Sequence, residues 1–129
     1  MNHIKAFISG LVVPSIILPL VVVIAMETGK GQVLTHPFIH FIPWIWGIWN
    51  VLYFAFFKDF LPKNLEASLL ITGAVLGLLI AIYGVFVLNI PSAVGLPPPL
   101  HDIPLIAAPI LYAILWRYVV HPINQLLGV

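Results

Sequence analysis

Five side chains of types that bind metal ions lie just outside the long apolar stretches of this sequence. They are Glu27, His36, His40, His101 and Asp102. Imidazole nitrogens and carboxylate oxygens are ligands for zinc and copper, so these residues are candidates for a metal site. A narrower hypothesis is a b-type haem held between His40 and His101. The chain has no cysteine, so thiolate zinc sites, iron–sulfur clusters and disulfide exchange lack their reacting atom.

The two histidines of the haem hypothesis belong to a short motif that occurs twice. Residues 37–45 align with residues 98–106 in the pattern Pro-x-(Ile/Leu)-His-x-Ile-Pro-x-Ile. The same offset overlays the apolar stretches without a gap, as duplication of a two-helix unit would, with repeat units 1–61 and 62–122. We expect Pro43 and Pro104 to lie in the first turn of a helix, where the missing N–H costs nothing. A histidine just before such a turn can bond to a free backbone group. We favour this role over metal or haem binding and expect no cofactor.

The elements that position these residues are four apolar stretches. Hydrophobic residues make up 62% of the 129 residues and charged residues only 7%, against about a quarter charged in soluble domains. The stretches cover about 7–26, 42–57, 67–88 and 103–120. Helices of about 17–25 residues cross a bilayer, and lipid offers the backbone no partners, so each must be helical. We predict one all-α domain, residues 1–129, that forms a bundle of four transmembrane helices and binds no nucleic acid.

The distribution of cations predicts the orientation of the chain. Lys5, Lys58, Lys63 and Arg117 lie at one side of the predicted bundle, and only Lys30 lies at the other. Because cytoplasmic loops are enriched in Lys and Arg, both ends are expected in the cytoplasm. We predict an integral protein of a bacterial inner membrane. If the duplication is real, the two hairpins are related by a pseudo-two-fold axis along the membrane normal.

Small residues recur along one face of the third stretch and predict close helix packing. Glycine and alanine let a second backbone approach closely, within the chain or in a neighbouring protomer. The stripe consists of Gly73, Gly77, Ala81 and Gly84.

Other side chains inside the stretches bear on mobility and on helix association. Each interior proline removes a helix hydrogen bond and permits a bend, and the candidate hinges are Pro14, Pro19 and Pro109. Polar side chains at mid-depth more often bond between helices than bind a substrate. These are Ser15, Asn50, Tyr53, Thr72 and Tyr112.

No motif in the sequence names a substrate, a reaction or a cofactor, and we do not expect an enzyme. The leading hypothesis is a small accessory or scaffold subunit, oligomeric or part of a larger membrane complex, with membrane lipids around it. One alternative is an oligomeric transporter or channel for a small solute. Another is a redox subunit that binds metal or haem through the outer histidines.

Overall fold

The computed structural model describes residues 2–129, and these residues form helices and connecting turns without a β-strand. The long helices are α1 (His3–Glu27), α2 (Pro37–Leu52), α4 (Leu65–Ile82) and α6 (Ile103–Leu115). The short ones are α3 (Lys58–Phe60), α5 (Ile90–Ala93) and α7 (His121–Leu126). This confirms the all-helical fold class that the sequence predicts.

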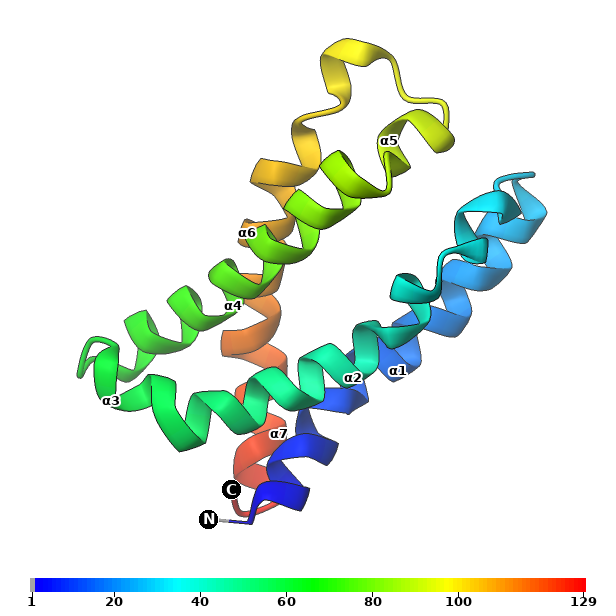
Figure 1. Cartoon of the computed structure of the whole chain (residues 1–129). Coiled ribbons are helices and arrows are strands. Elements are labelled where there is room, and N and C mark those ends of the chain that lie inside the picture. The colour runs from blue at the N-terminus through cyan, green and yellow to red at the C-terminus, as the bar shows by residue number, and fades with distance from the viewer. Residues whose placement is uncertain (1) are drawn as a thin grey trace.

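Four helical spans are long and apolar enough to cross a membrane, as the sequence predicts. They cover His3–Glu27, Pro37–Phe60, Leu65–Val87 and Pro98–Leu126, so all but the third extend beyond the predicted bounds at both ends. The connections after α1 and after α4 lie at the end of the molecule opposite the two termini (Figure 1).

The start of the second span differs from the expectation. Pro37 occupies the first turn of α2, and Pro43 lies inside the helix rather than at its beginning. His40 is therefore within α2, whereas His101 precedes α6, in whose first turn Pro104 lies as expected. The reason is that Pro37 has the preset φ of a first-turn residue and lacks an N–H, so the helix begins before the apolar stretch.

The long helices pack as two pairs, α1 with α2 and α4 with α6 (Figure 1). In the first pair, a Cβ on Gly10 would lie 2.6 Å from the carbonyl oxygen of Trp46, and one on Gly47 would lie 2.7 Å from the ring of Phe7. In the second pair, a Cβ on Gly77 would lie 2.5 Å from the carbonyl oxygen of Ala108. Each pair thus depends on glycine, because only a missing side chain lets the backbones come so close.

Three of the four spans contain a π-helical turn, in which the backbone bonds from residue i to i+5. These turns are Tyr53–Phe57, Tyr83–Val87 and Trp116–Val120. A π-turn accommodates one extra residue, so side chains beyond it are rotated about the helix axis. The first and last of these turns lie beside the buried polar residues described below.

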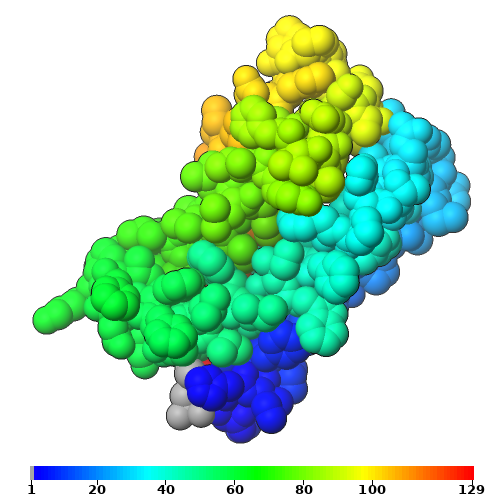
Figure 2. Space-filling model, viewed as in Figure 1, coloured from blue at the N-terminus to red at the C-terminus, as the bar shows by residue number. Residues whose placement is uncertain are grey.

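The two helix pairs also meet at the end opposite the termini. The amide Nε2 of Gln32, in the 3₁₀ turn Gly31–Thr35, donates to the carbonyl oxygen of Ala93 in α5 at 3.0 Å. Figure 2 shows these two segments in contact on the surface, the first in cyan and the second in yellow-green. The connection between α1 and α2 thus contacts the connection between α4 and α6, and this contact joins the two helix pairs.

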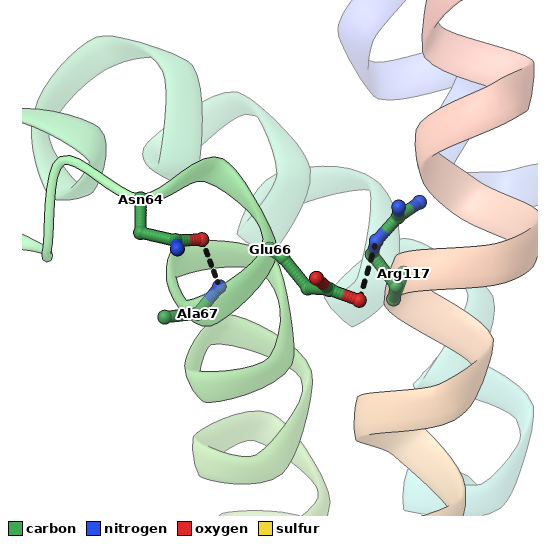
Figure 3. Close-up of polar contacts among 4 residues, drawn as sticks. All are labelled: Asn64, Glu66, Ala67 and Arg117. Atoms are coloured by element: carbon green, nitrogen blue, oxygen red, sulfur yellow. Dashed lines mark hydrogen bonds and ion pairs between the residues drawn. The ribbon is translucent and has the colours of Figure 1, made fainter.

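The start of α4 is held by capping and by one ion pair (Figure 3). The Asn64 side chain accepts a hydrogen bond from the Ala67 N–H at 3.2 Å, which satisfies a free donor of the first turn. Glu66 lies in that turn, where the helix dipole favours negative charge. Its carboxylate lies 3.7 Å from Nε of Arg117. This contact links the beginning of the third span to the end of the fourth.

Candidate functional site

Three buried polar side chains from three different helices bond to one another, and we call them the carboxamide cluster. The cluster consists of Ser9 in α1, Asn50 in α2 and Asn124 in α7, each almost fully shielded from solvent. The two carboxamides pair face to face: Asn50 Nδ2 donates to Asn124 Oδ1 at 2.8 Å, and Asn124 Nδ2 donates to Asn50 Oδ1 at 3.2 Å. The Ser9 hydroxyl donates to the same Asn124 oxygen. The cluster therefore joins the first helix pair to the end of the fourth span.

A further hydrogen bond ties the cluster to the backbone. Asn50 Nδ2 also donates to the carbonyl oxygen of Ala6 at 2.7 Å. Buried polar groups cost free energy unless they are bonded, so a cluster with mutual partners is far less costly than the same groups alone. The cluster contains no titratable group and no base beside the serine hydroxyl. The hydrogen bonds of the cluster link α1, α2 and α7 to one another.

A second set of polar contacts joins α2 to α4. The indole N–H of Trp49 donates to the carbonyl oxygen of Thr72 at 3.1 Å. Four residues further along the chain, at the start of the π-helical turn that follows α2, the Tyr53 hydroxyl lies 3.5 Å from the Ser68 hydroxyl. Thr72 in turn donates to the carbonyl oxygen of Ser68 at 2.7 Å. Asn50, Tyr53 and Thr72, three of the polar residues noted in the sequence, thus bond between helices or adjoin such bonds.

An aromatic group fills the space between the two helix pairs. The Trp46 ring meets the Tyr112 ring edge to face, with centroids 4.9 Å apart, and the Trp116 ring lies 5.4 Å from Trp46. Both tryptophans are buried, and neither indole N–H has a hydrogen-bond partner within residues 2–129. These two N–H groups are therefore buried donors without an acceptor in the described chain.

A cavity of about 240 Å³ adjoins this aromatic group, between α1, α2 and α6. Its inner wall includes the buried residues Val13, Pro14, Ile39 and Trp46, and its rim includes exposed apolar side chains of α1 and α6. Tyr112 also lines it. The cavity is apolar apart from these aromatic polar groups, and it opens onto the side of the molecule.

Two of the outer histidines, His40 in α2 and His101 just before α6, each bond to a backbone carbonyl oxygen. Nε2 of His40 lies 2.8 Å from the carbonyl oxygen of Leu34, and Nε2 of His101 lies 2.8 Å from that of Leu96. Among residues 2–129, no group of three or more His, Cys, Asp or Glu side chains comes together as a metal site would require. His36 precedes α2, Glu27 ends α1, and Asp102 precedes α6 without capping it.

The predicted small-residue stripe lies partly against α6. Side chains on Gly73 or Gly77 would collide with the backbone of α6, and Ala81 is buried. Gly84 differs, because the nearest atom to a Cβ there is the flexible end of Ile90, at 3.6 Å. The first two positions of the stripe therefore pack against another helix of the same chain.

The three candidate hinges lie in different surroundings. Pro14 is buried in α1 and lines the cavity. Pro19 is exposed in the same helix, and Pro109 lies half-buried inside α6. Pro14 is thus the candidate hinge that adjoins the interface between the helix pairs.

Several residues of the interface were missed in the sequence. Asn124 lies beyond the predicted end of the fourth stretch, and Ser9 lies near the start of the first, where polar residues are ordinary. Gly10 and Gly47 are single glycines in different helices. No spacing in the sequence signals that they would lie against each other's helix.

No protein-family model, curated protein or solved structure matches this chain.

Proposed function

We propose that this chain is a small integral membrane protein that acts as an accessory or scaffold subunit of a membrane assembly. The observation that carries the proposal is the carboxamide cluster, whose buried polar atoms bond to one another across α1, α2 and α7. Such polar groups serve as links between helices. A substrate site, by contrast, presents a few free polar groups to a pocket. The polar groups of this cluster therefore bond to one another and hold the helices together.

Insertion into a bilayer is part of the proposal. Four helices have the required length and apolar character. Their outward side chains include many large apolar residues, among them Ile16, Leu20 and Ile24 on α1 and Ile106 and Ile110 on α6. Lipid tails are the solvent for which such a surface is suited. We assign the chain to a bacterial inner membrane.

The proposed orientation places both termini in the cytoplasm. Lys5, Lys58 and Lys63 belong to the end of the molecule that contains the termini and the connection between α2 and α4, and Lys30 belongs to the opposite end. This distribution agrees with the enrichment of cations in cytoplasmic segments.

Duplication of a helix pair is a further part of the proposal. Two features support it: the close pairs α1–α2 and α4–α6, and the matching histidine contacts. His40 and His101 each lie 2.8 Å from a carbonyl oxygen of the preceding connection. A pseudo-two-fold axis along the membrane normal would relate the two pairs.

The test is purification of the tagged full-length protein in lipid nanodiscs cut directly from the membrane, followed by native mass spectrometry. A defined homo-oligomer or a stoichiometric partner subunit is the expected result. The Phe60→Ala variant changes an exposed side chain outside the carboxamide cluster. It is purified in parallel and shows how much of the assembly is lost during purification. A monomer without any stoichiometric partner would contradict the accessory role.

A second candidate function is passage of a small apolar solute, as an oligomeric transporter. It is favoured by one observation, which is that Pro14 lines the cavity between the helix pairs. A proline inside a helix permits bending, and bending here would change the cavity. Solute flux in proteoliposomes that is lost in the Pro14→Ala variant would support this function over the first.

A further inference from the structure

Buried hydrogen bonds join the two helix pairs toward the end of the molecule that contains the termini (Figure 1). The Asn50 and Asn124 carboxamides pair across the interface. The Trp49 indole N–H donates to the Thr72 carbonyl oxygen at 3.1 Å. Asn50, Thr72 and Asn124 are almost fully shielded from solvent. Breaking such bonds would leave buried polar groups without partners, which is costly. This part of the interface therefore holds the two pairs in a fixed relation.

At the opposite end, the pairs meet through a few groups at the surface (Figure 2). The exposed Gln32 side chain donates to the carbonyl oxygen of Ala93 at 3.0 Å, and within residues 2–129 this is the only hydrogen bond between the pairs at this end. The rings of Phe38 and Tyr83 also meet there, with centroids 4.4 Å apart, and neither residue is fully buried. An exposed amide can exchange its partner for water at little cost, so this end is easier to separate.

Two recesses lie along the interface between these ends. One is the cavity of about 240 Å³ between α1, α2 and α6, and the other, of about 250 Å³, lies between α2, α4 and the π-turn Tyr83–Val87. Both are lined by apolar and aromatic side chains. Side chains that border a recess have no protein atoms on that side, so they make fewer dispersion contacts. The outer halves of the two pairs are therefore loosely packed against each other.

Both helices of the first pair contain a buried proline between the carboxamide cluster and the outer end. Pro14 follows Ser9 by five residues in α1, and Pro43 precedes Asn50 by seven residues in α2. At about 1.5 Å per residue, these prolines lie roughly 8 and 10 Å beyond the cluster. Each proline removes a helix hydrogen bond and permits a bend, whereas α4 contains no proline. The helices α1 and α2 can therefore bend together at about the same height.

We propose that the outer halves of α1 and α2 swing together away from α4 and α6 by bending at Pro14 and Pro43, and that the hydrogen bond of Gln32 holds the closed position. In such a hinge motion, a few residues take up the change in backbone angle while the packed parts move as units. Opening widens both recesses at once, because each lies between the moving helices and the second pair. The motion depends on neither of the functions proposed above.

The test measures distances between two spin labels on the full chain in detergent micelles, and the absence of native cysteine leaves no background labelling. The outer labels are attached at Met26→Cys and Val87→Cys, both exposed positions. The reference labels are attached at Lys58→Cys and Leu126→Cys, also exposed, at the end that contains the termini. Pulsed electron–electron double resonance should give two distances for the outer labels and one for the reference labels.

Three variants then separate the parts of the proposal. Gln32→Ala should raise the ratio of open to closed populations about two- to tenfold, the effect of one lost hydrogen bond. The matched control is Gln125→Ala, which makes the same change at an exposed glutamine near the C-terminus and should leave the ratio unchanged. The double variant Pro14→Ala, Pro43→Ala should lower the ratio, because both helices regain a backbone hydrogen bond at the bend.

A single distance for the outer labels that Gln32→Ala leaves unchanged would overturn the proposal. So would an equal effect of Gln125→Ala, or a change in the reference distance, because the pairs would then separate at both ends. If the proline variant does not fold, the Gln32→Ala result decides, because Gln32 is exposed and its side chain contributes one hydrogen bond. An open population that is undiminished in a folded proline variant would place the bend elsewhere and refute the hinge.

Discussion

Replacement of Gly77 by alanine tests whether the close approach of α4 and α6 stabilises the fold. A Cβ at this position would lie 2.5 Å from the carbonyl oxygen of Ala108 and 2.9 Å from Cβ of Tyr112. Both neighbours belong to the backbone or its first side-chain atom, so neither can move aside without shifting α6. The substitution should force the two helices apart.

The expected magnitude is the balance of two effects. Overpacking of this kind costs about 1–3 kcal/mol. Alanine in place of glycine stabilises a helix by about 0.8–1.0 kcal/mol, because alanine has the higher helix propensity. The free energy of unfolding should therefore fall by roughly 0–2 kcal/mol.

Gly84→Ala is the matched control, because it makes the same chemical change near the end of the same span. Its Cβ would meet only the end of Ile90, at 3.6 Å, so only the propensity gain applies. The two variants should differ by about 1–3 kcal/mol, the overpacking cost alone.

The assay is reversible unfolding of both variants in mixed micelles of a mild detergent and SDS, followed by tryptophan fluorescence. Equal unfolding free energies for Gly77→Ala and Gly84→Ala would show that the α4–α6 contact is loose. The packing argument for the stripe would then be wrong.

Three further predictions concern the polar contacts and the topology. A double-mutant cycle of Asn50→Ala and Asn124→Ala should give a coupling energy of about 0.6–1.7 kcal/mol, the range for hydrogen bonds between membrane helices; unfolding in mixed micelles measures it, and additive effects would mean that the pair does not form. Because the chain has no native cysteine, Thr28→Cys should react with an impermeant maleimide from outside intact cells while Asn64→Cys is protected, and the reverse pattern would invert the proposed orientation. Glu66→Gln should lower stability by less than about 1 kcal/mol, with the loss reduced by added salt, because Glu66 is exposed; a larger, salt-independent loss would contradict a screened ion pair.

The fold class could be predicted from the sequence because it follows from composition and the length of apolar segments. Such segments leave the backbone no partner outside the helix. The boundaries were less predictable. Pro37 starts α2 before the apolar stretch begins, since a helix start depends on backbone geometry and not on hydropathy.

The candidate site was only partly visible in the sequence. Asn50 could be recognised as a polar residue that bonds between helices, since a carboxamide inside an apolar segment needs a partner. Its partners Ser9 and Asn124 could not be recognised. They lie at opposite ends of the chain, near the ends of their spans, where polar residues are ordinary.

What the sequence by itself determined is the number of apolar helices and the distribution of charge along them. What only the tertiary structure decided is the rotation of each helix about its axis, and with it the pairing of Asn50 with Asn124 and the placement of Trp46 beside Tyr112. The physical reason is that nearly every position in these spans is apolar, so periodicity marks no inward face. The π-turns Tyr53–Phe57 and Trp116–Val120 add a further rotation that local sequence does not reveal. Close contact between backbones at glycine then selects one arrangement among many of similar hydrophobicity.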